Sequence, residues 1–233
     1  KKQLKLFTLK NKFFQIVSHN YKNEAQILKI KYENLIHEIK VNLVGKIQLK
    51  NILMAIIAAS KSNLDLKKIF SVIPRLSSVE GRFEKIGKIK NKSLVFLDYA
   101  HTPDALQTCI LNIREQFPDK HISLLFGCGG DRDKIKRSKM LKVAIENAFK
   151  IIFTSDNSRS ENFDDICNDA KYDNDLKDVI VIEDRKEAII QGSKLINDND
   201  CMLILGKGHE ETQEINGIIS HFSDYEVVYE IYS

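Results

Sequence analysis

From residue 93 onward, short apolar runs alternate with helical patterns. The five runs cover residues 94–97, 122–126, 151–153, 179–182 and 202–205. None of them alternates polar with apolar positions, which predicts strands buried on both faces, as in a parallel sheet. Helical patterns cover residues 103–116, 136–147 and 185–196, with only a short turn of helix near 164–170. The alternation predicts an α/β domain with a Rossmann-like, mostly parallel sheet that carries helices on both faces.

The first part of the chain has a different pattern. Short alternating segments at 13–17, 25–30 and 35–44 predict strands, joined by polar connections at 18–23 and 32–34. A helical pattern over residues 49–59 follows Gly45, and a second short helix is expected at 65–73, capped by Asp65 and ended by Pro74. Residues 75–81 read as a linker. We therefore expect two domains, residues 1–78 and 79–233.

Polar and charged side chains follow each of the five apolar runs, at 98–102, 127–132, 154–161, 183–185 and 206–210. The carboxyl ends of parallel strands share one edge of a sheet, and ligands of open α/β sheets bind there. The densest set has three glycines at 127–130 and then six charged residues at 131–137. Backbone must approach something closely at such a glycine turn. The pattern therefore predicts a ligand site at this edge.

The residue types at this edge favour a zwitterionic ligand. Arg132 and Arg159 offer planar donors that suit carboxylates, whereas carboxylate and amide oxygens accept from ammonium groups. Such oxygens belong to Asp156, Asn157 and Glu210, although Asp156 taken alone could equally close a local turn. No complete phosphate loop is present, because no Ser or Thr follows Gly206-Lys207-Gly208, and the dinucleotide glycine fingerprint is missing.

Composition narrows the class further. The 233 residues are 43% hydrophobic and 29% charged, which indicates a globular chain. A net charge of +4 is too mild to argue for nucleic acid, and no apolar run is long enough to span a membrane. The four cysteines form no CxxC pair, so neither a zinc site nor a thioredoxin-like motif is indicated, and a reducing cytosol fits best. Because the chain begins at Lys1 without an initiator methionine, we expect a fragment of a longer protein.

Five motifs resemble, in order, the C-terminal half of the Mur ligases. They lie at residues 80–84, 98–106, 126–137, 155–161 and 206–210, and the resemblance spans about residues 45–224. It is strongest to the members that add 2,6-diaminopimelate. The resemblance implies an ATP-dependent amide ligase of peptidoglycan synthesis that works through an acyl phosphate. Residues 1–78 would be the end of the central ATPase domain and residues 79–233 the C-terminal, amino-acid-binding domain.

The resemblance also assigns residues and partners. The residues that would hold diaminopimelate are Arg132, Asp156, Asn157, Ser158, Arg159, Gly206 and Glu210; those that would contact ATP are Asn51, Arg82 and Asp98. Catalytic residues are expected upstream of Lys1, so this chain alone should be inactive. The implied cofactors are ATP and Mg²⁺, and the implied substrates are UDP-N-acetylmuramoyl-dipeptide and meso-diaminopimelate. A monomer in the bacterial cytoplasm is expected, with no nucleic-acid or membrane partner.

Two positions depart from the family pattern. Ser158 stands where the family's recognition motif has proline, and Gln48 stands where asparagine is usual. The charged members of the motif are present, so diaminopimelate specificity is expected, with Arg159 as the discriminating residue. The alternatives are a lysine-adding or folylpolyglutamate-synthase-like ligase, or a non-catalytic ligand-binding module. A dehydrogenase is disfavoured by the missing glycine fingerprint.

Overall fold

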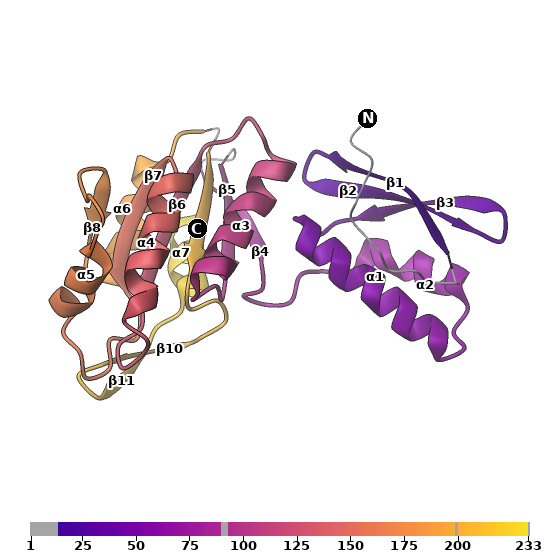
Figure 1. The fold of residues 1–233 in the computed structure, drawn as a ribbon. Helices are drawn as coiled ribbons and strands as arrows, with labels where there is room; N and C mark the ends of the chain where they lie inside the picture. Colours follow the sequence, from indigo (N-terminus) through magenta and orange to yellow (C-terminus); the bar gives the residue numbers. More distant parts are fainter. Residues whose placement is uncertain (1–13, 90–92, 199, 233) are drawn as a thin grey trace. The chain divides into compact units, whose positions relative to one another are not determined.

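The computed structural model describes residues 14–89, 93–198 and 200–232. The chain divides into two compact units, Lys1–Ser78 and Val79–Ser233 (Figure 1). Phe13, the first residue of the first expected strand, lies outside the described residues.

The smaller unit packs two helices on an antiparallel sheet. Its elements are β1 (Gln15–Lys22), β2 (Ala25–Tyr32), β3 (Leu35–Val41), α1 (Lys46–Lys61), α2 (Leu66–Val72) and the 3-10 turn η1 (Ile73–Arg75). The strands are ordered β1-β2-β3, and inward side chains such as Leu28 and Ile30 join Leu49 and Leu53 of α1 in one core. Asp65 caps α2 as predicted, with its Oδ1 accepting from the Lys67 amide at 2.9 Å.

The expected polar connection at 18–23 is wrong. Residues 18–22 continue β1 and pair with β2, and the chain reverses only at Asn23 and Glu24. Asn23 has φ 54°, a left-handed conformation that asparagine tolerates. The polar side chains that suggested a loop lie instead on a strand of a small sheet with a partly solvated face.

The larger unit is a doubly wound α/β domain, which confirms the predicted fold class. Its six-stranded sheet has the order β4-β5-β9-β6-β7-β8, with only the β4–β5 pair antiparallel. The strands are β4 (Glu84–Ile89), β5 (Ser93–Asp98), β6 (Ile122–Cys128), β7 (Lys150–Ser155), β8 (Val179–Val181) and β9 (Cys201–Leu205). The helices are α3 (Pro103–Gln116), α4 (Ile135–Asn147), α5 (Phe163–Lys171), α6 (Arg185–Leu195) and α7 (Asp224–Tyr232).

Helices cover both faces of this sheet. Helices α3, α4 and α5 lie side by side on one face, and α6 and α7 pack together on the other (Figure 1). The prediction of strands buried on both faces is confirmed for β5, β6, β7 and β9. It is wrong for β8, a partly exposed edge strand. Strand β4, helix α7 and the hairpin of β10 (Thr212–Ile215) and β11 (Ile218–His221) were not anticipated.

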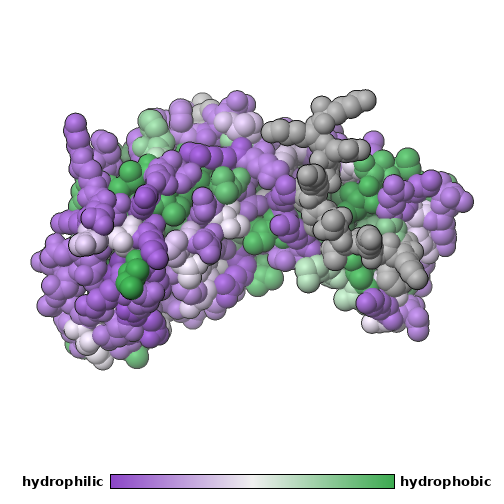
Figure 2. Space-filling view, in the orientation of Figure 1, coloured by the Kyte–Doolittle hydropathy of each residue, from purple (hydrophilic) through white to green (hydrophobic). Residues whose placement is uncertain are grey.

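The strand order determines where the loops meet. Strands β5, β6, β7 and β8 follow one another in the same direction across the sheet. The chain then crosses back, and β9 inserts between β5 and β6. The loops after β5, β6, β7 and β9 consequently converge at one edge, the usual ligand position in such sheets. On the face drawn in Figure 2 the larger unit is mostly hydrophilic, with small separate hydrophobic patches. Among the described residues, no helix has the length and apolar character needed to cross a membrane.

Candidate functional site

A pocket of about 230 Å³ lies at the carboxyl ends of these strands. Its lining residues are Tyr99, His101, Gly127, Cys128, Gly129, Arg132, Lys136, Asp156, Asn157, Arg159, Gly206 and Glu210. Six of the seven residues predicted to hold the amino acid are among them. Ser158 is not among them, and its side chain is buried.

The glycine turn after β6 closely approaches the loop after β7. A Cβ atom at Gly130 would lie 1.9 Å from the Ser158 carbonyl oxygen, and the Gly130 amide donates to Asn157 O at 2.8 Å. The fully buried Arg137 holds this turn from behind by donating to Gly129 O at 3.0 Å and to Glu161 at 2.7 and 2.9 Å. The hydrogen bonds that the Glu161 carboxylate accepts, chiefly those from Arg137, lower its pKa from 4.5 to about 2.

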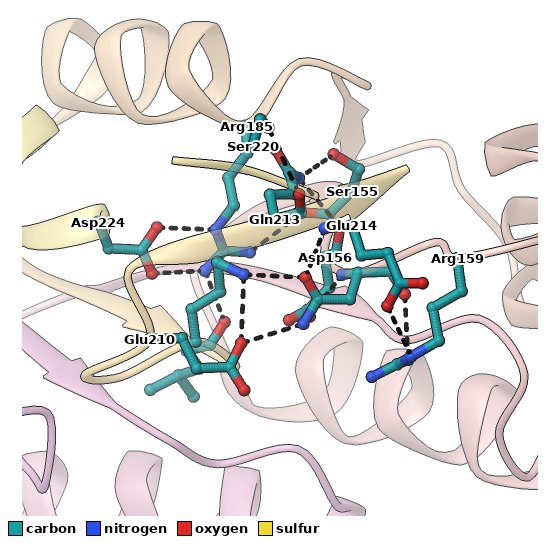
Figure 3. Close-up of polar contacts among 12 residues, drawn as sticks. Ser155, Asp156, Arg159, Arg185, Glu210, Gln213, Glu214, Ser220 and Asp224 are labelled. Carbon is teal, nitrogen blue, oxygen red and sulfur yellow. Dashed lines mark hydrogen bonds and ion pairs between the residues drawn. The ribbon is translucent and has the colours of Figure 1, made fainter. Parts of the chain in front are cut away.

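The loop after β7 supplies Asp156, Asn157 and Arg159. Arg159 has φ 52°, a sparsely populated conformation for a non-glycine residue. Its Nη1 donates to Gly130 O at 2.8 Å and to Asn157 O at 3.2 Å, and its Nε lies 3.6 Å from Glu214 Oε2 (Figure 3). The guanidinium therefore helps to build the loop as well as lining the pocket.

The loop after β9 contributes Gly206 and Glu210. Gly206 has φ 118°, a conformation that residues with a side chain rarely adopt, and a Cβ atom there would also displace Asp156 Oδ2, which would lie 2.5 Å away. The Glu210 carboxylate accepts from Asn157 Nδ2 at 3.0 Å and from Lys207 Nζ at 3.2 Å. Lys207 is completely buried, and the sequence did not mark it as a site residue.

A third buried cation ties these two loops together. Arg185 and Asp224 form an ion pair with no exposed side-chain surface, with N–O distances of 2.7 and 2.8 Å (Figure 3). Arg185 also donates to Ser155 O at 3.3 Å and to Leu205 O at 3.1 Å, the carbonyls that immediately precede Asp156 and Gly206. Its position directly after a strand end was the available sequence signal, but its partner on α7 could not be foreseen.

The unanticipated hairpin also supports the pocket. Gln213 Nε2 donates to Ser155 Oγ and to Asp156 O, both at 3.0 Å (Figure 3). The Glu214 amide donates to Asn157 Oδ1 at 3.0 Å, and its carbonyl accepts from the Arg159 amide at 3.0 Å. Strand β10 thus fixes the loop after β7 from the side opposite the glycine turn.

The residues predicted to contact ATP are less clearly assembled. Asp98 accepts from the Phe83 amide at 2.7 Å and from Cys109 Sγ at 3.4 Å, and burial raises its pKa. Arg82 is exposed, with its guanidinium 4.7 Å from the centre of the Tyr99 ring. Asn51 is exposed on α1 of the smaller unit, where Gln48 is buried. A carboxylate has about four acceptor positions, so Asp98 retains capacity for ligand hydroxyls.

The pocket is lined by charged side chains of both signs, so it can bind anionic and cationic groups of a ligand. Arg132, Lys136 and Arg159 are cationic, and Asp156 and Glu210 are carboxylates. Cys128 is no candidate nucleophile, because burial raises its pKa to about 12. In the described part of the chain, no cluster of three or more His, Cys, Asp or Glu side chains could hold a metal ion.

Comparison with known proteins identifies the relatives of this chain. Residues 81–208 match a protein-family model described as "Mur ligase, glutamate ligase domain". UDP-N-acetylmuramoyl-L-alanyl-D-glutamate–2,6-diaminopimelate ligase of Leptospira interrogans is 37% identical over 82% of this chain and 38% of its own length. The ligase of the same name from Clostridium perfringens is 37% identical over 94% of this chain and 44% of its own. The chain spans less than half the length of these two relatives.

Solved structures resemble the chain as well. One described as a UDP-N-acetylmuramoyl-L-alanyl-D-glutamate–2,6-diaminopimelate ligase matches with a TM-score of 0.73 and 32% identity, over 96% of this chain and 46% of that one. Folylpolyglutamate synthase of Mycobacterium tuberculosis, solved with ADP, matches with a TM-score of 0.66 over 84% of this chain and 45% of that one. At 18% identity, the second likeness concerns the fold alone.

Proposed function

The chain belongs to the Mur ligase family, and from this premise we propose that it is part of an ATP-dependent ligase that adds meso-diaminopimelate to UDP-N-acetylmuramoyl-L-alanyl-D-glutamate. In this proposal residues 79–233 are the amino-acid-binding domain and residues 1–78 the end of the ATPase domain. In the same proposal the protein is a monomer in the bacterial cytoplasm, with no nucleic-acid or membrane partner.

The balance of charge in the pocket is the observation that carries the choice of amino acid. Three cationic and two anionic side chains line it. Diaminopimelate has two carboxylates and two ammonium groups, whereas lysine has only one carboxylate. A second carboxylate gains most from planar guanidinium donors, and Arg132 and Arg159 lie on the two loops that meet at the glycine turn. The surplus of cations therefore favours diaminopimelate over lysine.

Within the same proposal, Arg82 and Asp98 contact ATP, with Asp98 accepting from ribose hydroxyls, and Asn51 contributes from the smaller unit. Bound ATP would supply the phosphoryl group that activates the carboxylate of the nucleotide substrate, and Mg²⁺ would neutralise its phosphates. The role of this chain is then to bind and orient the incoming amino acid. Groups that carry out phosphoryl transfer are assigned to the part of the protein upstream of Lys1.

The test is amino-acid-dependent ADP release by the full-length parent protein, given ATP and UDP-N-acetylmuramoyl-L-alanyl-D-glutamate. We expect release with meso-diaminopimelate and little with L-lysine, and at least a 30-fold loss of kcat/KM in Arg132→Ala, since a charged contact is worth about 2 kcal/mol or more. Turnover with lysine instead would reassign the substrate and make Ser158 the residue to examine. No turnover with either would favour a non-catalytic binding module.

A further inference from the structure

Lys207 is a buried cation that bonds to two of the residues lining the pocket. Its side chain has no exposed surface, and its Nζ lies 3.2 Å from both Asn157 Oδ1 and Glu210 Oε2. Because Asn157 Nδ2 also donates to Glu210 Oε2 at 3.0 Å, the three side chains form a closed triangle of hydrogen bonds. The triangle joins the loop after β7 to the loop after β9.

The triangle fixes the orientation of the Asn157 carboxamide. Its Oδ1 accepts from Lys207 Nζ and from the Glu214 amide, while its Nδ2 donates to Glu210. A reversed amide would place an NH₂ group against two donors, so the observed orientation is the one that satisfies every partner. Asn157 and Glu210 both line the pocket, and Glu210 keeps 29% of its side chain exposed there.

The position of Lys207 also argues against a direct contact with phosphate. Lysines that bind phosphate extend their ammonium group to the ligand, and in phosphate loops they are followed by Ser or Thr. Here Gly208 follows, and the ammonium is turned inward onto an amide oxygen and a carboxylate. A phosphate could reach it only by breaking the triangle.

We propose that Lys207 is a positioning residue of the amino-acid pocket. It holds Asn157 and Glu210 in the orientation that receives the ammonium end of the incoming amino acid, and acts on the substrate only through these two side chains. This inference rests on the function proposed above. Misplacing a binding group by about 1 Å can cost up to roughly 100-fold. We therefore expect Lys207→Met to raise the KM for the amino acid at least 10-fold.

The test is a double-mutant cycle in the full-length parent protein, with meso-diaminopimelate as the varied substrate. The variants are Lys207→Met, Glu210→Gln and the double variant; Lys194→Met, an exposed lysine on α6, is the control with unchanged kinetics. Because Lys207 acts partly through Glu210 and partly through Asn157, Lys207→Met should raise the KM less in the Glu210→Gln background than in the wild-type parent, since coupled residues are not additive. The KM for ATP should stay unchanged in all four.

The double variant removes one positive and one negative charge, so it leaves no buried charge unpaired and remains informative even where Lys207→Met folds poorly. Multiplying losses, an unchanged KM in Lys207→Met, or an equal rise in the KM for ATP would overturn the inference. Failure of the proposed function is visible separately in the wild-type parent: if no diamino acid supports ADP release, both proposals fall. If L-lysine supports it, the cycle is measured with L-lysine and judged by the same criteria.

Discussion

Replacing Asp224 by asparagine tests how the pocket is held together. The change keeps the side-chain shape but removes the charge that faces the fully buried guanidinium of Arg185. Removing one partner of a buried ion pair costs about 3–5 kcal/mol, because the other charge is left without compensation. Arg185 also donates to the carbonyls of Ser155 and Leu205, so we expect Asp224→Asn to loosen the pocket loops together with the fold.

Replacing both partners by apolar residues should be less damaging than replacing one. In Arg185→Met combined with Asp224→Leu, both charges of this pair are removed. The remaining loss of unfolding free energy is that of the two hydrogen bonds to Ser155 O and Leu205 O. At about 1 kcal/mol for each bond, the double variant should lose about 2 kcal/mol. It should therefore be more stable than Asp224→Asn.

The assay is unfolding of the 233-residue chain in guanidinium chloride, followed by far-UV circular dichroism because the chain has no tryptophan. The two units call for a fit with two transitions, of which the one belonging to residues 79–233 should shift. Glu230→Gln is a matched control, since its exposed pair with Lys186 also joins α6 to α7 and should cost less than about 1 kcal/mol. The reasoning is refuted if Asp224→Asn costs no more than this control, or if the double variant is the least stable.

Three further predictions concern the pocket loops. Because Arg137 holds the pKa of Glu161 at about 2, the ionised carboxylate stabilises the folded state. This contribution of about 2–3 kcal/mol is fully present above pH 4.5 and is lost toward pH 2. When the unfolding free energy is measured against pH, Glu161→Gln should flatten the curve in that range. Gly130→Ala should lower the unfolding free energy, measured by chemical denaturation, by about 1–3 kcal/mol or more, because the new Cβ would collide with Ser158 O. Gly217→Ala should lower it by only about 1 kcal/mol, because its Cβ meets nothing within 4 Å and only the positive φ is strained. Arg132→Ala should leave the unfolding free energy within about 0.5 kcal/mol of the wild-type value, because the Arg132 side chain is exposed. Arg159→Ala should lose stability as well as ligand binding, because Arg159 bonds to two carbonyls of the pocket loops. An equal fall in melting temperature for both variants would contradict this distinction.

Much of the fold could be predicted because local pattern and tertiary structure agree. The apolar runs became strands, and the helix predicted at 103–116 has those bounds in the structure. The hairpin of β10 and β11 was missed because Thr212–Ile215 and Ile218–His221 are short and neither is a continuous apolar run. The available signal was Asn216-Gly217 between them, a residue pair typical of two-residue hairpin turns, and both residues have positive φ. What fixes β10 is tertiary: its backbone and Gln213 bond to the loop after β7.

The site divides in the same way. Residues that follow a strand end, such as Arg132 and Glu210, could be placed at one edge because the geometry of a parallel sheet puts them there. The burial of Arg137, Arg185 and Lys207 could not be predicted, because charged side chains are ordinarily exposed and only a tertiary partner makes burial tolerable. Apart from Glu210, which lies three residues after Lys207, the partners lie between 24 and 50 residues away in sequence, with no local signal to connect them.

These three buried cations share one arrangement, and it bears on why they are there. Each bonds to a carboxylate and also to backbone or amide oxygen of a pocket loop: Arg137 to Gly129, Arg185 to Ser155 and Leu205, and Lys207 to Asn157. Stability alone is a weak reason for such pairs, since apolar residues of similar volume often stabilise a core equally well or better. Apolar residues, however, cannot donate to the oxygens that set the spacing between loops. The arrangement therefore favours a role in orientation: cations that do not themselves line the pocket hold the backbone and the side chains that form it.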